Sequence, residues 1–134
     1  MASILKVDDL RGNTTANDVT VTVGASATMS LEQGLVKHWC MFNSENSTVT
    51  AADSLNLSSI GDNAAGQYYQ NFTNNMNNTN YSCAATTGGA SISTFDLGFV
   101  ATRNDTTARS RSSKYYSGFQ DEPAWSVQVF GDIA

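Results

Sequence analysis

The sequence predicts an all-β protein, an antiparallel β-sandwich of about eight strands that is jelly-roll-like or immunoglobulin-like. Apolar and polar residues alternate over short runs, most strictly in Asp18–Gly24, where three valines share one strand face. Only 14% of the residues are charged, and Ser, Thr, Asn and Gly take their place. Clusters rich in Asn and Gly separate the runs, as turns between strands require.

The centre of the chain contains three of these runs, Val36–Phe42, Ser54–Ile60 and Gln67–Phe72. The segment Gly61–Gly66 between the last two is rich in residues that tolerate a positive φ angle, which favours a tight turn. Three short strands joined in sequence by such turns predict an antiparallel β-meander within Gly34–Tyr81.

Three further strands are predicted after the meander, at Tyr81–Thr87, Ile92–Thr102 and Trp125–Phe130. Arg103–Ser113 is charged, rich in Ser and Thr and without an apolar period, so we expect a long surface loop there. Lys114–Phe119 is either a short strand or a continuation of that loop.

One core between two sheets should contain the large apolar residues of these runs. We expect it to be lined by Val19, Val21, Val23, Trp39, Tyr68, Phe72, Trp125, Val127 and Val129. Gln70 falls on the same face as Tyr68 and Phe72, and a buried amide without partners costs about 1–3 kcal/mol. Either this face is not fully buried or another chain covers it, which favours an oligomer.

The length of 134 residues fits one domain. We expect residues 13–134 to form a single β-sandwich domain and residues 1–12 to form an extended N-terminal attachment segment. The residues of that segment expected to make contacts are Ile4, Leu5, Lys6 and Val7. The alternative for this segment is a first edge strand of the sandwich.

The net charge of −5 disfavours nucleic acid as a partner, since phosphate binding needs clustered Lys and Arg. No apolar run is long enough to predict a membrane span. The N-terminus lacks the basic region and the apolar stretch of a signal peptide, so we expect synthesis in a cytoplasm.

Catalytic and metal-binding patterns are weak. His38 has no Ser or Asp at a motif spacing and cannot complete a zinc ligand set, so we predict no enzyme, no metal and no cofactor. Spatial pairing of carboxylates for glycoside chemistry is the remaining enzymatic alternative. Cys40 and Cys83 are expected to be buried free thiols inside strands.

Basic and aromatic residues gather before the last strand, and they are the candidate contact residues for a receptor or for a neighbouring subunit. The set is Arg103, Arg109, Arg111, Lys114, Tyr115 and Tyr116. At a binding tip, the aromatic rings would stack on sugars and the arginines would pair with carboxylates or phosphates of a cell-surface polymer. The alternatives are a solvated loop and a contact to an acidic surface of a neighbouring subunit.

The central stretch also resembles a domain that recurs in tail-fibre and other virion proteins of bacteriophages, especially marine phages of the cyanophage type. Family members show a pattern close to GLAKAWVNFNGTGT followed by SFNVSSITDNGTGDYTVNFTTAMPDANY. The matching residues are Gly34–Asn43, Ser54–Asn63, Gly66, Tyr68, Asn71–Thr73, Met76, Asn80 and Tyr81. His38 and Gln70 depart from the family pattern, which commonly has a small or apolar residue and a valine there.

The resemblance implies a virion structural protein without catalytic residues, made in the host cytoplasm. We expect a short fibre, spike or knob module that assembles as a homotrimer with other virion proteins and contacts a host cell-surface polysaccharide. One alternative is a capsid decoration protein that cements the head and binds no receptor. A second alternative is a carbohydrate-binding module with an aromatic platform on one sheet face.

Overall fold

The computed structural model describes residues 6–10, 19–23, 27–31, 34–88, 99–115 and 119–134. Over these residues the chain forms ten β-strands and no helix. The strands are β1 Thr20–Val23, β2 Ala27–Ser30, β3 Val36–Phe42, β4 Ala51–Leu55, β5 Leu57–Ala64, β6 Gln67–Phe72, β7 Ser82–Gly88, β8 Phe99–Thr106, β9 Arg109–Tyr115 and β10 Ala124–Phe130. The chain divides into two compact units, Met1–Leu35 and Val36–Ala134.

The smaller unit contains the β1–β2 hairpin, whose antiparallel register pairs Val21 with Met29. The strand predicted within Asp18–Gly24 is therefore confirmed over Thr20–Val23, but its predicted place in the sandwich core is wrong. Val21 is 38% exposed, and β1 pairs with β2 within its own unit. Strict alternation shows that one face of a strand is apolar, but it does not show which sheet that face packs against.

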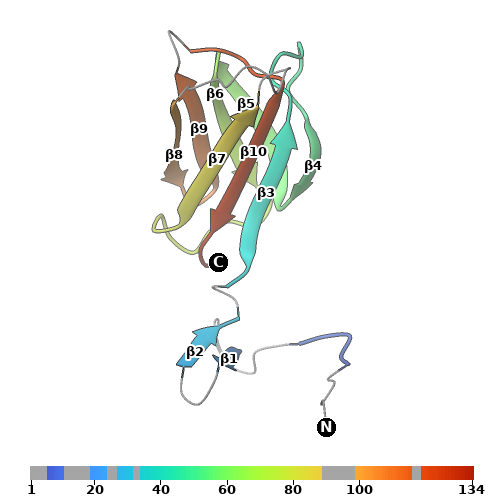
Figure 1. Ribbon diagram of the computed structural model, residues 1–134, viewed down its shortest axis with the longest axis vertical. Helices are drawn as coiled ribbons and strands as arrows, with labels where there is room; N and C mark the ends of the chain where they lie inside the picture. The colour runs from blue at the N-terminus through green and yellow to red at the C-terminus, as the bar shows by residue number, and fades with distance from the viewer. Residues whose placement is uncertain (1–5, 11–18, 24–26, 32–33, 89–98, 116–118) are drawn as a thin grey trace. The chain divides into compact units, whose positions relative to one another are not determined.

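The larger unit is an antiparallel β-sandwich, which confirms the predicted fold class (Figure 1). Within the described residues, one sheet has the strand order β4-β3-β10-β7 and the other has β5-β6-β9-β8. We call them the β3–β10 sheet and the β6–β9 sheet. The last strand, β10, returns to lie between β7 and β3 and pairs with both.

The predicted strand Ser54–Ile60 is two strands in different sheets. β4 pairs with β3 and β5 pairs with β6, and the chain passes between the sheets at Asn56. Asn56 has a φ of 57°, a left-handed conformation that asparagine tolerates better than most residues. Its side chain accepts a hydrogen bond from Asn74 N at 2.7 Å and donates one to Asn74 O at 3.1 Å. The meander is therefore folded over the core instead of lying flat.

The predicted surface loop at Arg103–Ser113 is wrong, because β8 and β9 form a hairpin there. The alternation in β9 is between arginine and serine: Ser110 and Ser112 are buried, while Arg109 and Arg111 are half-buried on the outer face. A strand whose inward side chains are serines has no apolar period, so hydrophobicity alone could not reveal it. Lys114 and Tyr115 extend the same strand.

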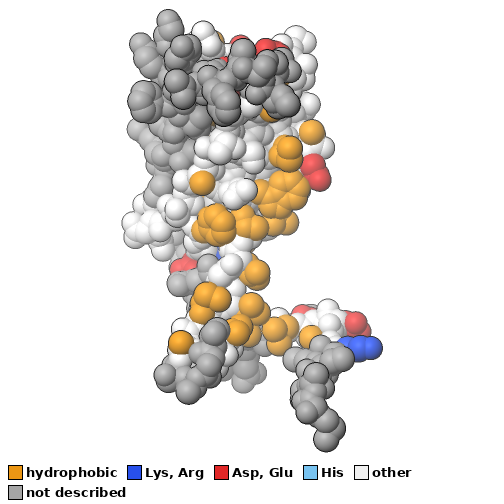
Figure 2. All heavy atoms as spheres, viewed as in Figure 1, with side chains coloured by type: hydrophobic (Ala, Val, Ile, Leu, Met, Phe, Trp, Pro, Cys, Tyr) orange, Lys and Arg blue, Asp and Glu red, His pale blue; other side chains and the backbone are white. Residues whose placement is uncertain are grey.

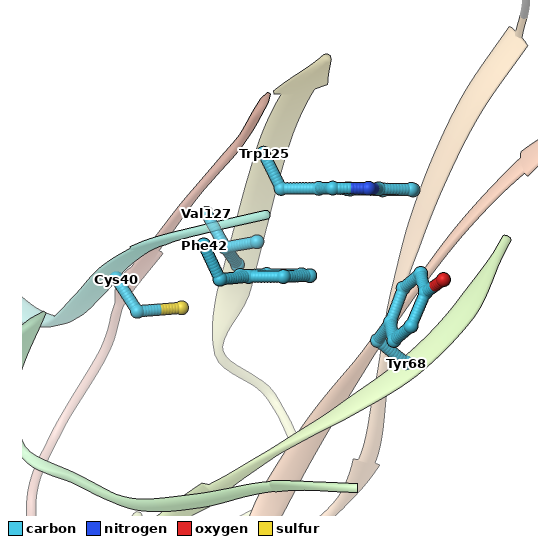
Figure 3. Packing of buried hydrophobic residues seen from close by; sticks show 5 residues of the cluster. All are labelled: Cys40, Phe42, Tyr68, Trp125 and Val127. Atoms are coloured by element: carbon cyan, nitrogen blue, oxygen red, sulfur yellow. The ribbon is translucent and has the colours of Figure 1, made fainter. Parts of the chain in front are cut away.

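Aromatic rings from both sheets form the main core cluster (Figure 3). The rings of Phe42 and Trp125 are nearly parallel, with centroids 5.6 Å apart, and Tyr68 meets both edge-on. Cys40 and Val127 complete the buried part of the cluster. The core positions predicted for Tyr68 and for the three inward residues of β10 are confirmed.

A second cluster lies around Phe72, Met76, Tyr81 and Val129. The C-terminal end closes over it: Ile133 forms a β-bridge with Met76, and Ala134 N donates to Asn75 O at 2.9 Å. Gly131 makes this closure possible, because a Cβ there would lie 2.7 Å from the Cβ of Tyr81.

Strand β3 presents His38, Cys40 and Phe42 to the core, and the predicted core position of Trp39 is wrong. Trp39 is half-buried on the outer face, whereas His38 is fully buried and its ring lies 5.0 Å from that of Phe72. The alternation of β3 was predicted, but assigning the larger apolar ring to the core reversed the face. Phe42 and Cys40, at even positions, decide the orientation.

The amide of Gln70 is satisfied within the chain. Gln70 is 0% exposed; its Nε2 donates to Ser112 Oγ at 2.8 Å, and its Oε1 accepts from Ser110 Oγ at 3.1 Å. The expectation that this face is incompletely buried or covered by another chain is therefore wrong. Gln70 no longer favours an oligomer, since the partner strand β9 supplies both hydroxyls.

Burying the imidazole of His38 opposes folding, because the ring loses hydrogen bonds to water that the protein does not fully replace. Its Nδ1 lies 3.4 Å from Asn56 O, and its Nε2 has no hydrogen-bond partner among the described residues. Burial lowers the pKa of His38 below the ordinary value of 6.5. The side chain is therefore held neutral in the folded protein, and protonation opposes folding.

We expect the free energy of unfolding to fall as the pH drops below about 6.5. Below that pH, His38 is protonated in the unfolded chain, whereas in the folded chain its lowered pKa keeps it neutral. The slope should reach at most about 1.4 kcal/mol per pH unit for this single histidine. His38→Leu should remove the slope between pH 5 and 7 and leave the protein at least as stable at pH 7, since an unpaired buried nitrogen disappears. Urea unfolding across this pH range measures both effects, and an unchanged slope in the variant would contradict the assignment.

Cys40 and Cys83 are both thiols and do not form a disulfide. Cys40 is buried and burial raises its pKa to about 12, whereas Cys83 is half-buried with its pKa raised to about 11. The prediction of a buried thiol is confirmed for Cys40, and Cys83 is more accessible than predicted.

Candidate functional site

The outer face of the β3–β10 sheet exposes large apolar side chains. Met41 is 52% exposed, Leu55 45% and Phe130 38%, and Trp39 is half-buried beside them. Figure 2 shows hydrophobic side chains gathered over β3 and its neighbours on this face. We call these four residues the outer patch.

The strand register makes the outer patch contiguous. Trp39 on β3 lies opposite Leu55 on β4, and Met41 follows two positions along the same strand. Phe130 on β10 lies opposite Val36, near the start of β3. Residues paired across strands have Cβ atoms about 5 Å apart, and diagonal neighbours lie about 7–8 Å apart. Trp39 and Leu55 are a direct pair, and Phe130 is two positions beyond Gln128, the partner of Trp39 on β10, so the patch is one surface that crosses three strands.

The outer face of the β6–β9 sheet has a different chemistry. The Arg109 guanidinium lies 4.2 Å from the ring centroid of Tyr69, and that of Arg111 lies 5.5 Å from it. Arg111 also donates a hydrogen bond from Nη2 to Oε1 of Gln67. Asn71, next on the outer face of β6, donates to Ser59 Oγ at 3.0 Å. We call Gln67, Tyr69, Asn71, Arg109 and Arg111 the Tyr69 site.

Only some of the predicted contact residues lie at the Tyr69 site. Arg109 and Arg111 lie together on β9, and Arg103 on β8 is in register with Arg111. Lys114 and Tyr115 lie at the end of β9; their side chains, like that of Arg103, are not among those described. Tyr116 lies outside the described residues.

The candidate attachment residues belong to the smaller unit. Lys6 and Val7 are exposed, with Val7 at 55%. Ile4 and Leu5 lie outside the described residues.

Tyr69 and Gln67 were not predicted as site residues. The signal was present, because Gln67, Tyr69 and Asn71 form the second face of the same alternating run whose first face holds Tyr68 and Phe72. Only the pairing of β6 with β9, which places Tyr69 opposite Arg111, shows that the two segments meet. That pairing joins residues about 40 positions apart and has no local signature in the sequence.

No group of three or more His, Cys, Asp and Glu side chains could hold a metal ion in the part of the chain that the structure describes. No helix in that part is long and apolar enough to cross a membrane. His38 is enclosed between the sheets and does not reach either outer face.

Comparisons with protein-family models, with curated proteins and with solved structures find no match. The resemblance to phage virion proteins therefore stays a prediction. The residues that carry it occupy mainly structural positions: Tyr68, Phe72, Met76 and Tyr81 are in the core, and Asn56 connects the sheets. Residues at these positions stabilise the fold, and they do not indicate what the protein binds.

Proposed function

We propose that the chain is a structural protein of a bacteriophage virion, a short fibre, spike or knob module that assembles on the particle. The observation that carries the proposal is the outer patch, since contiguous exposed apolar surface marks contacts between proteins. The motif within Gly34–Tyr81 supports the phage class, and the β-sandwich fold agrees with a building block of a particle.

Further copies of this chain are the proposed occupants of the outer patch, in a homotrimer. The patch lies across β4, β3 and β10, where the ladder hydrogen bonds of β3 and β10 are already made on both sides. The contact is therefore packing of side chains over a sheet face and does not add a strand to an edge. In a three-fold arrangement the three patches turn towards a common axis and leave the β6–β9 sheets outward.

The N-terminal segment is proposed to contact other virion proteins. Lys6 and Val7 are exposed, and Val7 is an apolar side chain without a place in the sandwich core. Deleting residues 1–12 should leave the larger unit folded, because Val36–Ala134 contains both core clusters. The truncated chain should be incorporated into particles less than the full chain.

Electron microscopy of particles from the phage that encodes the chain, labelled with antibodies against the purified protein, tests the function. Label on the tail or its fibres is the expected result. Label distributed over the head would overturn the fibre assignment in favour of capsid decoration. Particles that carry no label, with the protein found free in the lysate, would contradict a virion role altogether.

A further inference from the structure

The two guanidinium groups of the Tyr69 site are held in place before any ligand arrives. The Tyr69 ring lies within cation–π distance of both Arg109 and Arg111, and Gln67 fixes the end of Arg111 through a hydrogen bond. Long arginine side chains lose much rotational freedom when they bind, so arginines that are already ordered bind an anion at a lower entropic cost.

The described side chains around these arginines are neutral and hydrogen-bonding. On the outer face, β6 contributes the amides of Gln67 and Asn71, and β9 contributes Ser113 next to Arg111. On β5, Ser59 lies opposite Asn71, and Gly61 lies opposite Tyr69 with no side chain. Among the described side chains of this face there is no Leu, Ile, Val, Met, Phe or Trp, in contrast to the outer patch on the other sheet.

The spacing of the two arginines and the polar groups beside them suit a polymer that carries anionic groups. Arg109 and Arg111 are alternate residues on one strand, so their backbone positions are about 7 Å apart on a sheet face. Guanidinium groups bind carboxylate and sulfate oxygens in a bidentate manner, and the flanking amides and hydroxyls can pair with sugar hydroxyls. A chain of acidic sugars presents both kinds of group along its length.

We propose that the Tyr69 site binds an acidic polysaccharide, with Arg109 and Arg111 pairing with its anionic groups and Tyr69 positioning the two arginines. A nucleic acid is disfavoured because proteins bind single strands largely by stacking bases on aromatic rings, and the Tyr69 ring is occupied by the two guanidinium groups. A protein partner would bury an apolar centre, which this face does not offer among its described residues. Because the Tyr69 ring is occupied by the guanidiniums, it does not serve as a stacking platform for sugars.

Binding of the full-length protein to three soluble polymers tests the proposal by isothermal titration calorimetry. Polygalacturonate presents carboxylates, dextran sulfate presents sulfates, and unmodified dextran is the neutral control. We expect binding to at least one of the acidic polymers and none to dextran; the first two arms show which anionic group is preferred. Binding to neither acidic polymer, or equal binding to dextran, would overturn the inference, as would equal affinity for a single-stranded DNA of similar charge.

Three variants and one control test whether the polysaccharide binds at the Tyr69 site. Arg109→Gln with Arg111→Gln should weaken binding about tenfold or more, because two charge-assisted contacts are lost. Tyr69→Leu should weaken it several-fold although both charges remain, and Arg111→Lys should weaken it while keeping both the charge and the fold. Asn46→Asp with Ser47→Asp changes the net charge by the same amount as the double arginine variant, at exposed positions between β3 and β4, and is the matched control, with affinity within about twofold of the parent.

Equal losses for the Asn46→Asp, Ser47→Asp control and the double arginine variant would show a general charge effect and contradict the site. Unchanged binding in Tyr69→Leu would contradict the positioning role of the ring. The inference does not depend on the proposed virion role, because an isolated chain can bind the polymer whether or not it assembles into a particle.

Discussion

Trp125→Ala should lower the free energy of unfolding by about 3–5 kcal/mol, because it removes a buried indole and leaves a cavity between the sheets. The ring stacks on Phe42 and meets Tyr68 edge-on, and its Nε1 donates to Ser44 Oγ at 3.0 Å. That hydroxyl also accepts a hydrogen bond from Glu122 N at 2.7 Å, so it joins the indole to the segment that leads into β10. A loss of this size is a large share of the 5–15 kcal/mol that holds a typical domain together.

Trp39→Ala is the matched control, since it removes the same side chain from the outer face of the same sheet. We expect a loss of about 1 kcal/mol or less in the monomer. Urea unfolding followed by circular dichroism, at a protein concentration where the chain is monomeric, measures both variants without relying on tryptophan fluorescence. If Trp39→Ala costs as much as Trp125→Ala, the assignment of the two faces of β3 is wrong.

Gln70→Ala should cost about 2–4 kcal/mol, because it creates a cavity and leaves the buried hydroxyls of Ser110 and Ser112 without their amide partner. Gln67→Ala, on the outer face of the same strand, should cost much less. The triple change Gln70→Leu, Ser110→Ala and Ser112→Ala replaces the whole polar group by apolar side chains of similar size. Its stability should return to within about 1 kcal/mol of the parent.

The concentration dependence of these unfolding curves separates two explanations of Gln70. Within one chain, the cost of Gln70→Ala is the same at every protein concentration. If a neighbouring chain covered Gln70 instead, the cost would grow as the protein is concentrated. The second result, or a triple variant as unstable as Gln70→Ala alone, would contradict the network.

The sequence predicted those strands in which apolar and polar residues alternate. Val36–Phe42, Gln67–Phe72 and Trp125–Phe130 coincide with β3, β6 and β10, because an apolar residue at every second position is what a half-buried strand requires. The β9 strand was missed because its inward residues are serines that pair with Gln70. Hydrogen bonding, instead of hydrophobicity, makes that strand compatible with the interior.

Long-range pairing was the other part that the sequence could not show. The break at Asn56 depends on hydrogen bonds to Asn74, eighteen residues further along the chain. In the candidate sites, the arginines were identified from composition, but their partner Tyr69 was not, because it lies on another strand. The outer patch was missed for a related reason: Trp39 was assigned to the core, so no apolar face remained to be exposed.

Multi-angle light scattering of the purified protein is the most direct test of the central claim that the outer patch is an assembly surface. The parent should show a mass near three times that of the 14.3 kDa chain at high concentration. Met41→Glu places a charge in the patch and should shift the protein to the monomer, because burying an unpaired charge in the interface is costly. Asn63→Glu adds the same charge at an exposed position on the other sheet and should keep the parent's mass. A parent that stays monomeric at every concentration, or a Met41→Glu variant that still forms the trimer, would contradict the account.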